Sequence, residues 1–422
     1  MMNWAMLLLG IITYYSIGRR YQSAILIAMS LYVYWLVSQW SIVPIAIQSS
    51  VIVLSGLLIG KHPNKWLLVT AIISIILVFI LLKEGVFRQK FPIGLSVVSF
   101  TGISYIVDQY REPKRYSIIY VLSYLLFFPK IFAGPIERAK SFIDVEPKDF
   151  LGKNIYTGIK YLIFAAFCKF IVGDILASTD FDSLGIGLLF QMLTFGIGFF
   201  FDFWAYTMMA IGIGYIFGYK LSVSFNKPYY AGTFKEFWHR WNITLGTWLR
   251  DYIYIPCGGN HLGLPLWCGA VLLVFIISGL WHGTTLPFIV WGVAHAGFLM
   301  IEKVIVKPRR FKAICRYCYA LGVALIAALL WQLFIVDSLR EFLYRFQNVF
   351  SYWHFDIFSL GQFVLCAIAT VLLTLDKVFN LVRCESTSRS GIIAEVTMLT
   401  LMSATLLLMN CPLSFNFFYF RF

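Results

Sequence analysis

The sequence has little charge. Only 13% of its 422 residues are Asp, Glu, Lys or Arg, whereas 60% are hydrophobic. A soluble domain averages about 25% charged residues, so a soluble globular protein is excluded and a polytopic membrane protein is indicated. The charge has one dominant sign, with 34 Lys and Arg against 20 Asp and Glu. Such an excess is typical of loops that hold basic residues in the cytoplasm. No basic, aromatic-interleaved soluble segment is present, so we expect no nucleic-acid binding.

Several patterns that carry chemistry are also missing. There is no GxSxG nucleophile elbow, no HExxH sequence and no carboxylate-rich cluster. Serine-hydrolase and metalloprotease functions therefore lose their main support, and we expect no metal site. The eight cysteines are scattered, and only Cys315 and Cys318 form a CxxC. Without a second CxxC or a nearby His, these two residues are interpreted as small hydrophobes rather than zinc or redox ligands.

The hydrophobic residues form runs that predict membrane-spanning helices. A span needs about 20 apolar residues, and several runs are shorter. We therefore expect an all-α polytopic membrane protein of roughly 11–14 helices, some of them broken or re-entrant. No period-2 barrel pattern appears. The candidate spans lie near residues 4–17, 21–38, 42–60, 66–82, 92–107, 116–133, 157–178, 184–201, 203–219, 264–278, 286–303, 318–336, 359–380 and 391–410.

The distribution of basic residues gives only a partial topology. The clearest basic loop, which we place in the cytoplasm, contains Lys303, Lys307, Arg309, Arg310, Lys312 and Arg316. Lys83, Arg88 and Lys90 do not alternate simply with that loop, so the topology over 83–115 stays open. Pro129 and Pro135 predict a kinked span that ends in a charged loop.

The densest polar segment is 235–251. Aromatic residues are interspersed in it, and Phe237, Trp241 and Trp248 share one face at helical spacing. This pattern is typical of a helix lying at a membrane interface. A plain amphipathic anchor with Trp in the interfacial belt is the alternative. Its ionisable and amide residues are Lys235, Glu236, His239, Arg240, Asn242, Arg250 and Asp251.

His282 stands alone in a long apolar run. Gly279, Gly283 and Pro287 around it favour a break in the helix, where backbone groups need partners. Only about 15–18 apolar residues lie on each side, roughly 25 Å of helix, which is short for two full spans. We therefore expect a break at the floor of a water-filled cavity. An ionisable residue inside a membrane is a functional-site hypothesis by default.

His282 and Asn242 together suit acyl transfer. A neutral His accepts the proton of an attacking hydroxyl, and an amide N–H₂ donates to the developing oxyanion. The alternative is a structural His bonded to a helix carbonyl. In a continuous helix, His295 would lie about 140° round and 20 Å along from His282. It is therefore predicted to be a supporting or structural group. Arg250 could bind an anionic donor or form a structural ion pair with Asp251.

At these residues the chain resembles the membrane-bound O-acyltransferase (MBOAT) family. The most similar branch is that of the bacterial membrane proteins of alginate O-acetylation and teichoic-acid D-alanylation. The resemblance covers most of the chain from about Pro92 onward, and the YIYIPCGGN sequence favours the alginate-acetylation side. The segments that carry it are PIGLSVVSFTGISYIVDQYR, FFPKIFAGPIER, CKFIVGDILA, FFDFWAYTMMAIGIG, FNKPYYAGTFKEFWHRWNITLGTWLRDYIYIPCGGN, SGLWHG and FFYFRF.

The resemblance implies one transmembrane domain over 1–422, with less diagnostic N-terminal spans over 1–91 and a catalytic core over 92–422. It implies a ring of helices around a funnel, with a donor from the cytoplasm and an acceptor from outside. The catalytic His of the LWHG motif is His282, and the polar residue after FWxRW is Asn242. That position is commonly His in this branch and Asn in the wider family. Met208 stands where the branch typically carries an acid, which leaves Asp202 as the only acid in that stretch.

We therefore expect a multi-pass O-acyltransferase of the bacterial inner membrane. It would move a short acyl group, acetyl before others, from acetyl-CoA or an acyl carrier toward an exported polysaccharide, without a permanently bound cofactor. Its expected partners are the bilayer, the donor and an extracytoplasmic acetyltransferase. The alternatives are D-alanyl transfer to teichoic acid and a transporter or flippase, which the lack of an internal repeat disfavours.

The residues expected in the site fall into three groups. His282 and Asn242 are catalytic, and His295 and Asp251 support them. The residues expected to bind donor or substrate are Lys235, Trp238, Arg240, Trp241, Arg250 and Trp281.

Overall fold

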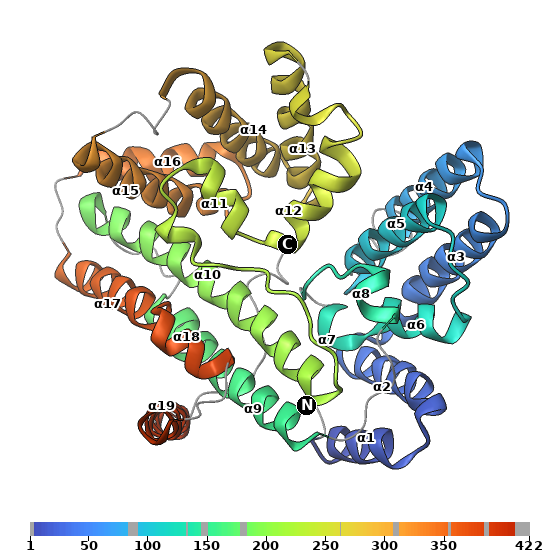
Figure 1. Ribbon diagram of the computed structural model, residues 1–422. Coiled ribbons are helices and arrows are strands. Elements are labelled where there is room, and N and C mark those ends of the chain that lie inside the picture. The colour runs from blue at the N-terminus through green and yellow to red at the C-terminus, as the bar shows by residue number, and fades with distance from the viewer. Residues whose placement is uncertain are drawn as a thin grey trace. The chain divides into compact units, whose positions relative to one another are not determined.

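The protein is helical throughout its described part. The computed structural model describes residues 4–82, 92–131, 134–144, 151–177, 184–261, 263–306, 312–352, 356–383 and 388–409. These residues form nineteen α-helices with short 3₁₀ and π segments, and no strand occurs among them (Figure 1). Seven of their helical segments are long and apolar enough to cross a membrane. The predicted all-α polytopic membrane protein is confirmed.

Some predicted features lie outside the described residues. They are Lys83, Arg88 and Lys90, the part of the basic loop that holds Lys307, Arg309 and Arg310, and the terminal FFYFRF segment.

The chain forms two compact units. One comprises Met1–Gly158 with Ala210–Ser222, and the other Ile159–Met209 with Val223–Phe422. The single domain over 1–422 and its division after residue 91 stay predictions. The helices that begin in the first unit are α1 (Trp4–Ser16), α2 (Gln22–Val37), α3 (Ile42–Lys61), α4 (Lys65–Ile80), α5 (Leu95–Arg111), α6 (Ile118–Leu126), α7 (Phe128–Ile131), α8 (Ala139–Ile143) and α9 (Gly152–Phe167).

In the first unit, the predicted kink lies between α6 and α7. Pro129 has no N–H with which to continue the ladder of α6, so the chain turns at Phe127. Lys130 follows and is fully buried, with Nζ 3.8 Å from the centre of the Tyr124 ring. The Tyr124 hydroxyl donates to the backbone oxygen of Glu137 at 2.8 Å, and the Glu137 carboxylate accepts from the Ser222 hydroxyl at 3.0 Å. The kinked segment is therefore held by buried polar contacts.

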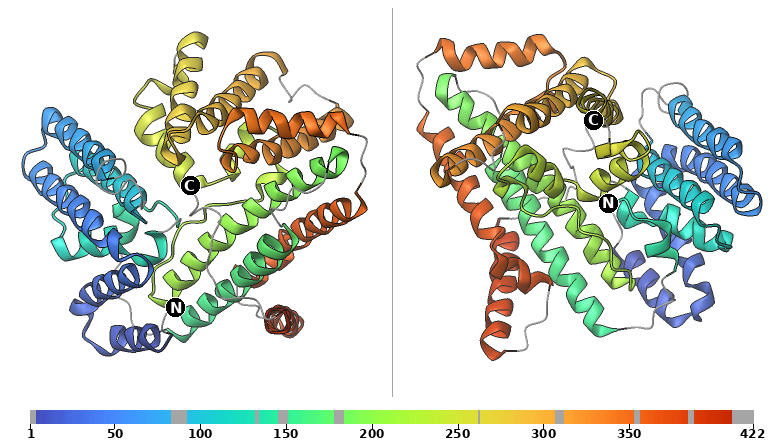
Figure 2. Two further views of the ribbon diagram at one scale, coloured as in Figure 1. Left: turned by 180° about the vertical axis from the view of Figure 1, so that it is seen from behind. Right: turned by 45° about the horizontal axis from the view of Figure 1, so that its top comes forward.

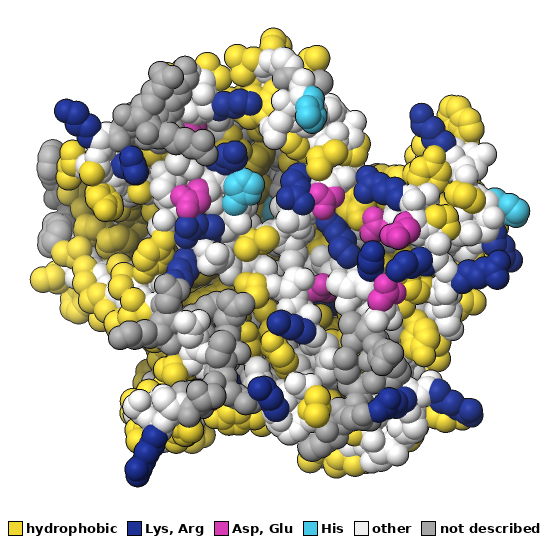
Figure 3. All heavy atoms as spheres, viewed as in Figure 1, with side chains coloured by type: hydrophobic (Ala, Val, Ile, Leu, Met, Phe, Trp, Pro, Cys, Tyr) yellow, Lys and Arg dark blue, Asp and Glu magenta, His cyan; other side chains and the backbone are white. Residues whose placement is uncertain are grey.

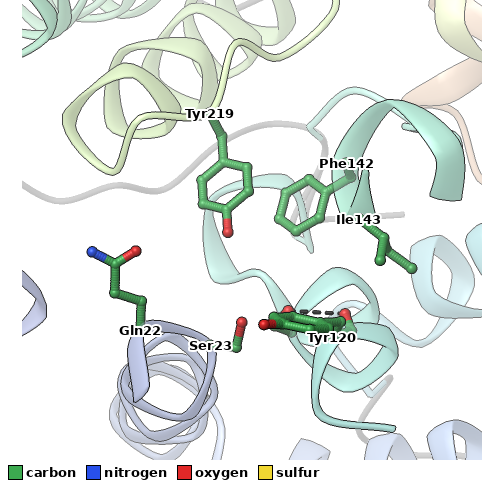
Figure 4. A pocket seen from close by; sticks show the side chains of 7 residues that line it. Gln22, Ser23, Tyr120, Phe142, Ile143 and Tyr219 are labelled. Atoms are coloured by element: carbon green, nitrogen blue, oxygen red, sulfur yellow. Dashed lines mark hydrogen bonds between the residues drawn. The ribbon is translucent and has the colours of Figure 1, made fainter. Parts of the chain in front are cut away.

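A small pocket also lies in this unit. Its volume of about 10 Å³ is roughly the room that one water molecule takes. The rings of Phe142 and Tyr219 stack at one wall, with centroids 4.4 Å apart. The pocket is too small for an acyl donor or a sugar. The pocket is lined by Gln22, Ser23, Tyr120, Ser123, Phe142, Ile143 and Tyr219 (Figure 4).

The second unit contains the longest helix, α10 (Gly185–Ile216), which continues into the first unit. Here α13 and α14 run side by side (Figures 1 and 2). The other α-helices that begin in this unit are α11 (Phe234–Arg240), α12 (Ile243–Leu249), α13 (Leu264–His282), α14 (Leu286–Ile301), α15 (Ala313–Leu330), α16 (Leu339–Ser351), α17 (Ile357–Leu373), α18 (Asp376–Arg383) and α19 (Arg389–Leu408).

The prediction of separate spans over 184–201 and 203–219 is wrong, because α10 passes through both without a break. The hydropathy dips at Asp202, yet this carboxylate is fully buried and lies 2.6 Å from Lys169 Nζ. Lys169 also pairs with Asp174, at 2.6 Å. It belongs to a π-helix (η4, Cys168–Leu176), whose i→i+5 hydrogen bonding brings residues five apart onto one face. Because Lys169 offsets the cost of burying the Asp202 charge, α10 continues through this residue.

A second buried ion pair attaches the last described helix. Lys160 on α9 lies 3.0 Å from Glu395 on α19, with side-chain exposures of 0% and 3%. Lys160 also donates to the backbone oxygen of Leu381 at 3.0 Å. Most of α19 is not packed against other described residues, since only 11% of its most apolar 18-residue stretch is buried. The ion pair is therefore the main polar attachment of α19 to α9.

We expect Lys160→Met to lower the unfolding free energy by roughly 3–5 kcal/mol, because it leaves Glu395 buried without its cation. The double variant Lys160→Met/Glu395→Leu should recover most of that loss, and denaturant unfolding in detergent measures both. As a control, Lys114→Met breaks a half-exposed pair with Asp144 and should shift the midpoint little. Equal losses in the single and double variants would contradict this account.

Candidate active site

The break predicted at His282 is present between α13 and α14. His282 is the last residue of α13, Gly283 caps it in an extended conformation, and Pro287 lies in the first turn of α14. The two flanking segments are longer than predicted. They have 19 residues over Leu264–His282 and 21 over Leu286–Val306, so each is long enough to cross a membrane. The shorter estimate is wrong because Gly279 lies inside α13 instead of ending it.

Two glycines let α13 and α14 approach closely. A Cβ atom on Gly279 would lie 2.4 Å from the backbone oxygen of Phe288, and one on Gly292 would lie 2.4 Å from that of Phe275. Real Cβ atoms do not approach so closely, so any larger residue would push the helices apart. The role of Gly279 is therefore close packing, which brings His282 against the first turns of α14.

Aromatic rings surround the half-buried His282. Its ring centroid lies 4.8 Å from that of Phe334, 5.5 Å from Trp291 and 4.5 Å from Trp281. Phe334 belongs to a 3₁₀ segment (η10, Trp331–Phe334) that follows α15, and both ends of η10 are buried. Contacts from three segments restrict the orientation of the imidazole, as a general base requires.

The single helix expected over 234–248 is two helices. Thr233 caps α11 by accepting from the N–H of Glu236 at 3.0 Å. The helix ends at Arg240, and Asn242 adopts a left-handed conformation at φ 40° and ψ 55° before α12 begins. Asn is one of the few residues other than Gly that tolerate this region. The prediction of one helix missed this because neither Gly nor Pro marks the break.

A neighbouring segment satisfies the backbone at this break. The N–H of Ile243 donates to Ser224 at 2.7 Å, and the N–H of Asn226 donates to Arg240 at 2.9 Å. The side chains of Ser224 and Thr244 are also hydrogen-bonded, at 3.2 Å. The Asn242 side chain is 9% exposed and makes no capping hydrogen bond to α12. Its amide is therefore not used to cap the helix that follows it.

The aromatic face of this segment does not lie at a membrane interface. Phe237, Trp241 and Trp248 are 0%, 3% and 4% exposed, and they pack inside the protein. Trp241 stacks on Trp331 with centroids 4.4 Å apart. The interfacial prediction is wrong for these three residues because protein covers them, and for Trp241 the cover comes from α10 and η10.

These rings join the segments that carry Asn242 and His282. Trp241 contacts Trp331, Trp331 contacts Phe334 at 5.2 Å, and Phe334 contacts His282. Sequence reasoning missed Trp331 and Phe334, whose only signal is the aromatic sequence WQLF at the end of a span. That the two polar side chains face one cavity stays a prediction.

His295 lies on α14, beyond the break, so the continuous helix assumed for its position relative to His282 does not exist. It is fully buried, and its ring lies 4.8 Å from Trp238 and 5.1 Å from Trp291. Among the described residues, neither ring nitrogen has a hydrogen-bond partner. Trp291 contacts both imidazoles, so its indole ring links His295 to His282. Its supporting role stays a prediction.

Charged side chains lie on α11 and on the π-helix that follows α12 (η6, Arg250–Tyr254), and charges of both signs are seen on this face of the protein (Figure 3). Lys235 is exposed, Arg240 pairs with Glu236, and Arg250 Nε lies 2.8 Å from Asp251 Oδ1. The Arg250 side chain is nevertheless 54% exposed, and such a surface pair is worth only about 0–1 kcal/mol. The ion pair is therefore present and leaves Arg250 able to meet an anion.

His239 lies among these charges. Partial burial lowers the pKa of its imidazole, and the positive charges of Lys235 and Arg250 lower the pKa further. His239 is therefore predominantly neutral at pH 7, so the positive charge of this patch comes from its Lys and Arg residues.

The backbone of Asn242 gives a test of stability. Asn242→Gly keeps the left-handed conformation available, whereas Asn242→Ala makes it unfavourable by roughly 1–2 kcal/mol. We expect unfolding in detergent to show the alanine variant destabilised by about that amount and the glycine variant close to wild type. Equal stability of the two variants would show that the φ of 40° is not retained in solution.

Comparisons with known proteins complete the description. The sequence model of the membrane-bound O-acyltransferase family, MBOAT, matches residues 20–325. A probable alginate O-acetylase of Pseudomonas fluorescens is 29% identical over 377 residues, covering 83% of this chain and 74% of that protein.

Two further relatives align over shorter stretches. A peptidoglycan O-acetyltransferase of Helicobacter pylori is 33% identical over 249 residues, covering 50% of this chain and 47% of its own length. A teichoic acid D-alanyltransferase of Bacillus subtilis is 30% identical over 232 residues, covering 48% of this chain and 57% of that protein. The chain thus spans about half the length of these two proteins.

Proposed function

The chain belongs to the membrane-bound O-acyltransferase family, whose sequence model covers well over half of it, and on that premise we propose that it acetylates hydroxyl groups of an exported polysaccharide. Membership makes it a multi-pass O-acyltransferase and removes the transporter alternative. The observation that carries the proposal is the match, over 83% of this chain, to a protein named as an alginate O-acetylase. A second relative is named for O-acetylation of peptidoglycan, another polymer with sugar hydroxyls.

In the proposed reaction His282 is the general base. Its imidazole takes the proton of the acceptor hydroxyl while the hydroxyl oxygen attacks the thioester carbonyl carbon. Asn242 donates its amide N–H to the carbonyl oxygen as that oxygen becomes negative. The C–S bond then breaks, the oxyanion returns to a carbonyl, and the leaving thiolate takes the proton from the His282 imidazolium, which becomes neutral again. The rings of Phe334 and Trp291 pack against the imidazole and restrict its orientation.

The proposed donor is a cytoplasmic thioester, acetyl-CoA or an acyl carrier. The backbone N–H groups of Phe234 and Lys235 bond to Glu302, so α11 begins beside the end of α14 that leads into the basic loop. Because that loop is predicted to be cytoplasmic, the exposed cations of α11 and η6 (Arg250–Tyr254) would face the same side. Lys235, Arg240 and Arg250 would then meet the phosphates of coenzyme A or of a carrier's phosphopantetheine.

The proposed location is the bacterial inner membrane, with the acceptor reached from the opposite side. An extracytoplasmic acetyltransferase would then carry the acetyl group onward if transfer to the polysaccharide is not direct.

D-alanyl transfer to teichoic acid is the second candidate. It is favoured by the 30% identity to the Bacillus subtilis D-alanyltransferase. The chemistry at His282 would be the same, with a different acyl group on the thioester.

Deletion of the gene, followed by mass spectrometry of surface glycans, separates the two candidates. We expect O-acetyl groups to be lost and D-alanyl esters to stay. Loss of D-alanine alone would support the second candidate, and no change in either ester would contradict both.

His282→Ala should lower surface O-acetylation by about 10²–10⁴-fold, the usual contribution of a general base, at an unchanged protein level. His261→Ala is a suitable control because His261 is exposed at the end of a short 3₁₀ segment (η7, Gly259–His261). We expect this control to keep full acetylation. Acetylation that survives in the His282 variant would mean that another group is the base.

Asn242→Gly tests the amide separately from the backbone. It should lower the rate by about 10²–10³-fold, the usual loss for one oxyanion donor, while the protein stays folded. The same assay of surface acetylation reports it, with unfolding in detergent as the check on folding. Wild-type acetylation in this variant would exclude Asn242 as the donor to the oxyanion.

A further inference from the structure

Glu302 is a buried carboxylate at the point where α14 ends. Its side chain belongs to a short π-helix (η8, Glu302–Val306) and is 7% exposed. It accepts three hydrogen bonds, from the N–H of Phe234 at 2.6 Å, the N–H of Lys235 at 3.2 Å and the hydroxyl of Tyr319 at 3.0 Å. Glu302 thus bonds the first turn of α11 and the side of α15.

The hydrogen bonds to α11 are chemically strong ones. The first N–H groups of a helix have no partner within that helix, and they carry the positive end of its dipole. A carboxylate is the acceptor that such groups prefer, and charge-assisted hydrogen bonds are shorter and stronger than neutral ones. Thr233 bonds the N–H of Glu236, so Glu302 and Thr233 together satisfy the first three N–H groups of α11.

Further contacts show that α11 lies along α14 in the opposite direction. Phe234 stacks on Phe298 with centroids 4.7 Å apart, and Trp238, one turn later in α11, contacts His295 and Trp291. The contacting residues of α14 and of η8, which continues it, are numbers 291, 295, 298 and 302; they are spaced three or four apart and therefore form one face. Glu302 bonds one end of this contact, and Trp291 at the other end touches His282.

The register of α11 against α14 therefore determines where Asn242 lies. Ring packing alone tolerates small shifts along a helix, whereas two hydrogen bonds to one carboxylate fix the start of α11. Asn242 follows the last turn of α11, and His282 packs on the first turns of α14.

We propose that Glu302 is a positioning residue for acyl transfer. Its carboxylate holds α11 in register against α14 and so keeps the amide of Asn242 in place relative to the imidazole of His282. This rests on the proposed function for the reaction it serves, although the hold on α11 is measurable without it.

The test uses the full chain in native membranes for activity and in detergent for structure. Glu302→Gln keeps the shape but replaces the carboxylate, whereas Tyr319→Phe removes only the hydroxyl and leaves both bonds to α11. With labelled acetyl-CoA as the probe, we expect Glu302→Gln to lower kcat about tenfold or more, which corresponds to the loss of a charge-assisted hydrogen bond. The KM for acetyl-CoA should stay within about twofold, and Tyr319→Phe should resemble wild type in both constants.

Hydrogen exchange measures the hold on α11 directly. Glu302→Gln should raise exchange in a peptide over 233–242 and leave a peptide over 264–282 unchanged. Glu302→Asp, which keeps the charge on a shorter arm, should be intermediate in exchange and in kcat. It decides the matter if Glu302→Gln is not recovered as folded protein.

Two results would overturn the proposal. One is hydrogen exchange and kcat equal to wild type in Glu302→Gln, or in Glu302→Asp if the glutamine variant is not recovered as folded protein. The other is a rise in hydrogen exchange over 264–282 equal to that over 233–242, together with a loss of activity that parallels the loss of folded protein. This result would mean that Glu302 stabilises the protein in general and does not position α11. A wild-type protein that transfers no acetyl would overturn the proposed function instead, and exchange over 233–242 would then show whether Glu302 holds α11.

Discussion

An ionised group inside an apolar bundle needs a partner within the protein, and this constraint governs the buried charges of the second unit. Lys169 lies between two carboxylates, Lys160 meets Glu395, and Glu302 receives the free N–H groups of α11. Apart from the contact of Lys169 with Asp174 inside η4, each pairing joins different helices that are distant in the sequence. Hydrophobic burial makes the bundle compact, but it is nearly uniform along these apolar helices and specifies register weakly. A hydrogen bond joins two particular atoms, so each buried polar pair restricts how the helices can slide past each other.

The same constraint explains where the chain is irregular. Helix α11 ends at Arg240 because the segment around Ser224 accepts and donates the hydrogen bonds that the break exposes. The turn between α13 and α14 is compatible with Gly283 and Pro287, which remove a side chain and a donor at that point. Both irregular points carry a polar side chain at the end of a helix, Asn242 after α11 and His282 as the last residue of α13. The groups proposed for acyl transfer thus lie where the regular helices stop.

Sequence patterns predicted the helical class, the break at His282 and the concentration of polar residues over 235–251, because each depends on neighbouring residues. They did not predict that α10 is continuous, since the partner of Asp202 lies 33 residues earlier in the chain. The division into α11 and α12 was also missed, because a left-handed Asn gives no signal as strong as Gly or Pro. The rings of Trp331 and Phe334 and the carboxylate of Glu302 join the site only through tertiary packing. The family resemblance located His282 and Asn242, but it did not give the contacts that orient them.

The stacking of Trp241 on Trp331 has an optical consequence. Two indole rings 4.4 Å apart and only 26° from parallel couple their electronic transitions. The pair therefore contributes to the near-ultraviolet circular dichroism of the protein, and the size of that contribution depends on the rings keeping their mutual orientation. Since one ring precedes Asn242 and the other lies three residues before Phe334, the signal follows the integrity of the site itself. The protein thus carries an intrinsic spectroscopic reporter of its candidate active site, readable without substrate or label.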